Sequence, residues 1–88
     1  MTDESKNPFE DIQAAFLEAV EMQLRENDPP ETRLTLNRLI SEGLNEKNAK
    51  KLIADTIEAE TMWIIEKKET FDHKRFAKRL EKLSNRRK

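Results

Sequence analysis

The chain has 88 residues, enough for one domain, and 40% of them are charged against 35% hydrophobic, so its core must be thin. Glu, Lys, Leu, Ala and Arg dominate the composition, and these helix formers, with one glycine and no tyrosine, predict an all-α fold rather than a sheet. The formal net charge is −1, and the absence of cysteine excludes disulfides, thiolate metal sites and cysteine nucleophiles.

The net charge hides a strong asymmetry along the chain. Residues 71–88 contain eight Lys and Arg against two Asp and Glu, a charge of +6, which leaves −7 for the other residues. An acidic body with a basic end suits self-association, an internal charge match or an acidic partner. Neither a signal peptide nor a run of about 18 apolar residues is evident, so we expect a bacterial-type cytoplasmic location without membrane contact.

The first helix is predicted over residues 8–27, after a polar stretch, residues 1–6, that we expect to be disordered. Asn7 is suited to be its N-cap, with Pro8 at the first helical position and Glu10 at the third. The apolar stripe of this helix repeats every three or four residues and consists of Phe9, Ile12, Phe16, Val20 and Leu24.

The second helix is predicted over residues 30–42, because the proline pair Pro29 and Pro30 ends one helix and opens another. Its apolar side chains are Leu36, Leu39 and Ile40. The only glycine, Gly43, follows at a position where helices commonly end in left-handed backbone, and Asn45 is suited to cap the next helix. A tight corner therefore makes the second and third helices neighbours.

The third helix is predicted over residues 46–69, the longest helical pattern in the chain. Its apolar stripe consists of Ala49, Leu52, Ile53, Thr56, Ile57, Trp63 and Ile64. A shorter fourth helix is predicted over residues 73–84, with Asp72 as N-cap and with Phe71 and Phe76 spaced as a hydrophobic staple. Its core residues would be Phe76, Leu80 and Leu83.

These elements predict a small antiparallel bundle of four helices, three of them long and one short. The bundle would form a single helical domain over residues 7–84, and the basic tail, residues 85–88, should fray. The third helix is long enough to organise the domain, because about 24 residues at 1.5 Å each span roughly 36 Å.

Four segments of the chain resemble a bacterial family of small, uncharacterised, all-helical cytosolic proteins, a domain of unknown function. These segments are residues 16–24 (FLEAVEMQL), 26–31, 38–43 and 48–54 (NAKKLIA). The resemblance covers roughly residues 9–80 and implies an all-helical fold. The histidines of that family are missing, because Gln13, Leu17 and Lys51 stand at their positions, so no metal or proton-transfer role is implied.

Glu60 lies between Ile57 and Trp63 on the apolar stripe, where an unpaired buried carboxylate would cost several kcal/mol. We favour a place at the edge of the stripe, with the carboxylate reaching water. The alternatives are a cleft, in which a raised pKa would indicate function, or a polar partner. The candidate partners are Arg33, Arg38 and Gln23.

Met62, Trp63, Ile64 and Ile65 form the densest apolar cluster of the chain. Four adjacent residues point to all sides of a helix, so they cannot all face one core. We favour cover by the last helix through Phe71 and Phe76, and the alternative is a self-association surface.

The basic side chains of the last helix and tail are a possible contact for anions or nucleic acid. They are Lys74, Arg75, Lys78, Arg79, Lys82, Arg86 and Arg87. We favour a solvated face that balances the acidic body, because the polar face has no aromatic residue and the pI of the chain is acidic. The only histidine, His73, has no second histidine to form a metal site and is expected to be an exposed first-turn residue.

The sequence therefore predicts no enzyme, no catalytic residue, no cofactor and no metal. It favours a protein-binding or self-associating module, whose partner is an unknown protein or a second copy. The surface would include Glu60 and the cluster of residues 62–65. The alternative is a nucleic-acid-associated protein that uses the basic C-terminal helix.

Overall fold

The computed structural model describes the backbone of residues 8–84 and the side chains of residues 11–84, and these form four helices with no strand among them. The helices are α1 (Pro8–Glu26), α2 (Pro30–Ser41), α3 (Glu46–Lys67) and α4 (His73–Glu81). The predicted all-α fold is confirmed. The four predicted helix starts agree with the structure, and the C-terminal ends lie one to three residues earlier than predicted. The expected disorder of residues 1–6, the Asn7 cap and the tail of residues 85–88 lie outside the described residues.

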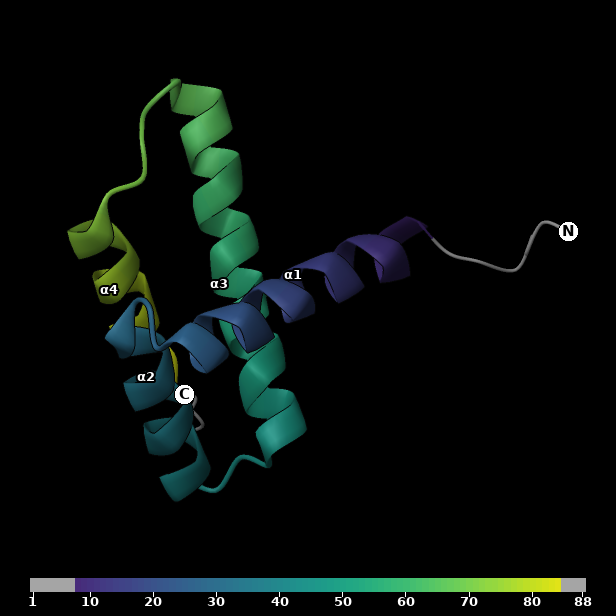
Figure 1. The fold of residues 1–88 in the computed structure, drawn as a ribbon, viewed down its shortest axis with the longest axis vertical. Helices are drawn as coiled ribbons and strands as arrows, with labels where there is room; N and C mark the ends of the chain where they lie inside the picture. Colours follow the sequence, from purple (N-terminus) through teal and green to yellow (C-terminus); the bar gives the residue numbers. More distant parts are fainter. Residues whose placement is uncertain (1–7, 85–88) are drawn as a thin grey trace, which may run out of the picture.

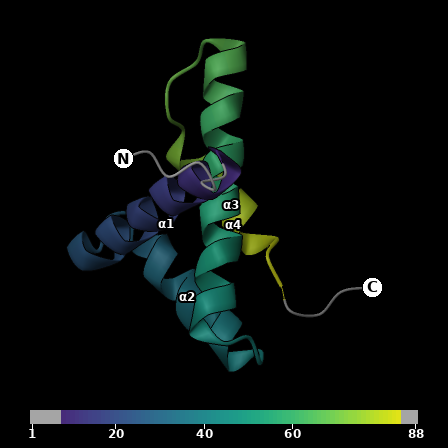
Figure 2. The same ribbon diagram turned by 90° about the vertical axis from the view of Figure 1, so that its right-hand side faces the viewer.

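Helix α3 is the central element of the bundle, because each of the other three helices packs against it. Helices α2, α3 and α4 alternate in direction, whereas α1 crosses α3 at a steep angle (Figure 1). In Figure 2, α4 passes obliquely behind α3, beginning on the side where α1 lies and ending on the other side. Past the crossing, the N-terminal part of α1 and the last turns of α3 extend away from the other helices.

The helix ends follow the chemistry that the sequence predicts. Asn45 caps α3, since its side chain accepts a hydrogen bond of 2.7 Å from the amide of Asn48. Gly43 ends α2 with φ 110°, a left-handed conformation that costs a residue with a side chain roughly 1–2 kcal/mol. The end of α3 was not predicted correctly, because Lys68 adopts the same left-handed region, with φ 55°.

The start of α4 was predicted in detail. The side chain of Asp72 accepts hydrogen bonds from the amides of Lys74 and Arg75, at 2.9 and 3.2 Å. The rings of Phe71 and Phe76 lie 5.7 Å apart between centroids, the contact expected of a hydrophobic staple. The cap and the staple together direct the chain from the extended segment after α3 into α4.

The core lies where α1, α2 and α4 meet α3. Its buried apolar residues are Val20, Leu24, Leu36, Leu39, Ala49, Ile53, Ala54, Phe76 and Leu80. Two predicted apolar positions are instead exposed, Ile12 by 44% and Ile40 by 42%. Helix α2 buries Thr32 and Thr35 beside its leucines, and the hydroxyl of Thr32 donates a hydrogen bond of 2.7 Å to Oε1 of Gln23. This bond explains how a polar residue lies at the α1–α2 contact.

Candidate functional site

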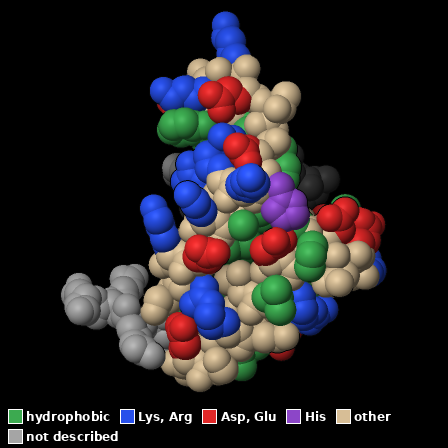
Figure 3. Space-filling model, turned by 90° about the vertical axis from the view of Figure 1, so that its left-hand side faces the viewer, with side chains coloured by type: hydrophobic (Ala, Val, Ile, Leu, Met, Phe, Trp, Pro, Cys, Tyr) green, Lys and Arg blue, Asp and Glu red, His purple; other side chains and the backbone are tan. Residues whose placement is uncertain are grey.

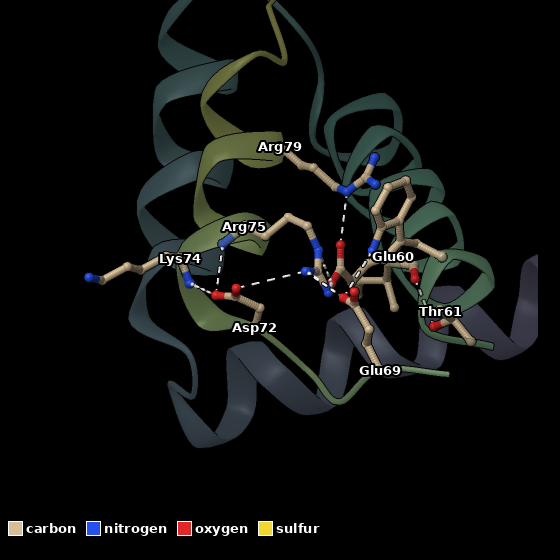
Figure 4. Close-up of polar contacts among 9 residues, drawn as sticks. Glu60, Thr61, Glu69, Asp72, Lys74, Arg75 and Arg79 are labelled. Carbon is tan, nitrogen blue, oxygen red and sulfur yellow. Dashed lines mark hydrogen bonds and ion pairs between the residues drawn. The ribbon is translucent and has the colours of Figure 1, made fainter. Parts of the chain in front are cut away.

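The contact between α3 and α4 is built around Glu60, which is only 2% exposed. Nη2 and Nε of Arg75 donate hydrogen bonds to Oε2 of Glu60 at 2.6 and 2.9 Å, and Nε of Arg79 donates to Oε1 at 2.8 Å. Figure 4 shows both arginines reaching from α4 toward this carboxylate on α3. Two guanidinium groups therefore hold both oxygens of one buried carboxylate.

The predicted exposure of Glu60 and its predicted partners were wrong. Arg33 donates to the carbonyl of Leu24 and Arg38 to carbonyls of the last part of the chain, so neither reaches Glu60. The physical reason is the antiparallel return of α4 along α3. Arg75 and Arg79 are four residues apart and so lie on one side of α4, next to the α3 carboxylate.

The pKa of Glu60 also differs from the expectation for a functional cleft, in which it would be raised. Burial opposes ionisation and by itself would raise the pKa of Glu60, but the hydrogen bonds and charges of Arg75 and Arg79 outweigh it. The pKa of Glu60 is therefore lowered from its usual value. An ionised carboxylate with both oxygens engaged is poorly suited to act as a general base or acid.

A second layer of this site surrounds the indole of Trp63. Nζ of Lys67 lies 5.1 Å from the ring centroid, and the guanidinium carbons of Arg75 and Arg79 lie at 5.7 and 5.9 Å. Indole Nε1 donates to Oε1 of Glu69 at 3.4 Å, and Nη1 of Arg75 donates to the same oxygen at 3.3 Å. The arginines thus bind Glu60 and cover the indole face at the same time.

The apolar cluster of residues 62–65 is only partly covered. Trp63 and Ile64 are half-buried, whereas Met62 is 53% and Ile65 is 64% exposed. Phe71, which we expected to cover this cluster, is itself 53% exposed and lies against Phe76 and His73. Apolar side chains therefore remain at the surface of the last turns of α3.

The structure divides the predicted basic set into two groups. Arg75 and Arg79 bind Glu60, while Lys74, Lys78 and Lys82 are exposed and, within residues 8–84, have no ion-pair partner. Figure 3 shows Lys and Arg side chains gathered on this side of the molecule, and Lys74 points away from Glu60 in Figure 4. Arg86 and Arg87 lie outside the described residues.

Two further polar contacts fasten α4 to α2, and the sequence analysis missed both. His73 Nε2 lies 2.8 Å from Oε1 of Glu31, and this hydrogen bond lowers the pKa of Glu31. Arg38 donates to the carbonyls of Leu83 at 2.8 Å and Leu80 at 3.0 Å. Arg38 therefore adds donors at the C-terminal end of α4, where the carbonyl of Leu80 also accepts a hydrogen bond of 3.1 Å from the amide of Leu83.

The described residues contain no group of three or more His, Asp or Glu side chains arranged to hold a metal ion. Their buried side-chain polar atoms all have hydrogen-bond partners. Among the same residues, none of the helices combines the length and the apolar character needed to cross a membrane. No protein-family model, curated protein or solved structure matches the chain.

Proposed function

We propose that this chain is a non-enzymatic binding module that acts on another protein surface. The observation that supports it is the exposed apolar surface on the last turns of α3, formed by Met62 and Ile65. Apolar side chains clustered on an element that extends from the core are typical of protein interaction sites. Burying them against a partner would gain roughly 25 cal/mol for each Å² of apolar surface removed from water.

The chemistry around Glu60 supports this proposal by favouring a structural role for the site. Its charge is neutralised by Arg75 and Arg79, which in turn cover Trp63. This arrangement fixes α4 on α3 and so holds the exposed α3 surface in a defined shape. We propose a cytoplasmic setting, in keeping with the resemblance of roughly residues 9–80 to a bacterial family.

A photo-crosslinking phenylalanine derivative in place of Met62 tests the proposal. We expect protein adducts, with the purified chain or in a cell lysate, because this position would lie within an interface. The control carries the same derivative in place of Glu18, an exposed residue of α1. Equal adduct yields at both positions, or none at position 62 in either sample, would count decisively against the proposal.

A second candidate function is nucleic-acid binding through Lys74, Lys78 and Lys82, whose ammonium groups are exposed and unpaired within residues 8–84. Changing all three to Gln should abolish retardation of DNA or RNA at low salt. Each lost phosphate contact should also reduce the slope of log affinity against log salt by about 0.9 for duplex DNA. The control replaces Lys47, Lys51 and Lys68, which are also exposed, by Gln.

A further inference from the structure

A shallow groove runs between α3 and α4 on the side of α3 away from α1. Its walls are Leu52, Asp55 and Ala59 of α3, Arg79 of α4, and Lys82 and Leu83, which follow α4 directly. We call the surface on both sides of this groove the α3–α4 face. Since α1 packs on the other side of α3, no helix of residues 8–84 covers this face.

The α3 side of this face carries an acidic stripe. Asp55, Ala59, Met62 and Glu66 follow at spacings of four, three and four, so they line one side of the helix, and all four are exposed. Within residues 8–84, neither Asp55 nor Glu66 has an ion-pair partner. The stripe therefore combines two unpaired carboxylates with apolar Ala59 and Met62 between them.

The α4 side of the face carries a basic stripe of Lys74, Lys78 and Lys82, each four residues from the next. Like charges at this spacing repel each other and weaken a helix by a few tenths of a kcal/mol per pair. The acidic stripe does not relieve this repulsion within the chain, because no lysine of the basic stripe forms an ion pair with Asp55 or Glu66. The acidic stripe of α3 and the basic stripe of α4 thus approach each other at the groove, which Asp55 and Lys82 both line.

We infer that the α3–α4 face binds a second copy of the chain. A two-fold axis along the groove would bring the groove end of the acidic stripe of each copy, at Asp55, toward the groove end of the basic stripe of the other, at Lys82. Each contact would then occur twice, as in any isologous dimer. Asp55 would approach the Lys82 of the second copy, because both residues line the same groove. This inference rests on the proposed function and names the partner.

Charge complementarity favours a second copy over other occupants. A nucleic acid or an anionic membrane would be attracted by Lys78 but repelled by Asp55 and Glu66 on the same face.

The size of the face indicates how tightly the dimer would bind. Helix α3 has 22 residues and α4 has 9, about 33 and 14 Å in length. Such a face is at the low end of specific interfaces, so we expect a micromolar or weaker dimer.

The test is a charge-reversal exchange between Asp55→Lys and Lys82→Glu, followed by sedimentation velocity. Protein concentrations should run from about 1 μM to about 1 mM, a range that covers weak association. Each variant alone should raise the dissociation constant of its homodimer at least about tenfold, because two opposite-charge contacts become like-charge contacts. An equimolar mixture should restore a dimer, since the lysine introduced at position 55 of one variant would then face the glutamate introduced at position 82 of the other.

The control is Glu18→Lys, which reverses a charge on α1, away from this face, and should leave the dissociation constant unchanged. Far-ultraviolet circular dichroism checks that every variant is folded. A wild-type chain that stays monomeric at about 1 mM overturns the inference. Failure of the mixture to restore the dimer overturns it as well.

Other outcomes separate this inference from the proposed function. Crosslinks from position 62 in a lysate, with a wild-type chain that remains monomeric, overturn the second copy as partner but retain protein binding. A second such outcome is that Lys82→Glu loses nucleic-acid binding while every variant sediments with the same molar mass as the wild type. This outcome overturns the dimer and supports the second candidate function. Crosslinks between copies of the purified chain, together with restoration of the dimer in the mixture of the two variants, support both proposals.

Discussion

The two halves of α3 are held in the fold by different physics. In the first half, Ala49, Ile53 and Ala54 are buried among apolar residues of the core. In the second half, the buried residue is Glu60, and it is held by three hydrogen bonds from two arginines of α4. One continuous helix thus passes from nonpolar packing to a charged contact.

The difference teaches what each kind of contact contributes. Apolar burial is non-directional and supplies most of the stabilisation of a small domain. A buried ion pair gains little over a well-packed apolar pair, because taking the charges out of water is costly. Its geometry is specific, however, and Glu60 accepts Arg75 and Arg79 only in one register of α4 on α3. The first half therefore provides stability and the second half provides register.

The largest expected effect comes from removing both arginines. Arg75→Ala with Arg79→Ala leaves the Glu60 carboxylate buried without a partner, which should lower the free energy of unfolding by about 3–5 kcal/mol. Ile53→Ala, the matching change in the first half, should cost about 2–5 kcal/mol through the cavity it leaves. Urea unfolding followed by circular dichroism measures both values.

The control for this prediction is Lys74→Ala with Lys78→Ala, which also removes two positive charges from α4. Each of these exposed substitutions should change stability by no more than about 0.5 kcal/mol. Equal losses for the arginine and lysine pairs would mean that net charge, rather than the Glu60 contact, holds α4 in place.

A smaller effect is expected from Arg38→Ala, which removes the donors to the carbonyls of Leu80 and Leu83. The loss should be about 1.5–3 kcal/mol, since a hydrogen bond from a charged group contributes in this range. The loss should be local. Relative to the wild type, amide hydrogen exchange should become faster in the last turn of α4 but not in α3. Arg33→Ala is the matched control, because its hydrogen bond to Leu24 is longer, at 3.4 Å.

Much of the fold could be predicted because its signals are local. Asn45 and Asp72 cap the helices that follow them, and Gly43 ends α2 in the predicted conformation. The exposure of Ile12 could not be predicted from periodicity. An apolar stripe shows which side of α1 faces a partner, but not how far along the helix the partner extends.

The partners of Glu60 could not be assigned because they depend on how α4 packs on α3. One signal was nevertheless present in the sequence. Arg75 and Arg79 flank Phe76 and Leu80, so the two arginines border the buried side of α4 and are placed to reach a carboxylate on the helix beneath. The sequence did not decide which residues of the cluster 62–65 would be exposed, since four adjacent apolar residues cannot share one face. In the structure these are Met62 and Ile65.

The smallest expected effect concerns the dependence of stability on pH. It distinguishes the contact of α4 with Glu60 on α3 from its contact with Glu31 on α2. The pKa values of Glu60 and Glu31 are both lowered from 4.5 in the folded chain, so each carboxylate stabilises the fold above its unfolded pKa. That contribution is lost as pH falls through the folded pKa, and the free energy of unfolding should therefore decrease below about pH 4.5.

Glu60→Leu isolates the buried contribution to this acid sensitivity. At pH 7 we expect a change within about 1 kcal/mol, because an apolar residue replaces the carboxylate and both partly exposed arginines can turn to water. Below about pH 4.5 the variant should lose less stability than the wild type, since it has no carboxylate to protonate at this position. Glu31→Gln should alter the acid response less, because solvent screens the Glu31–His73 pair. Urea unfolding across this pH range measures all three proteins, and a larger change for Glu31→Gln would place the acid-sensitive contact at α2 rather than at α3.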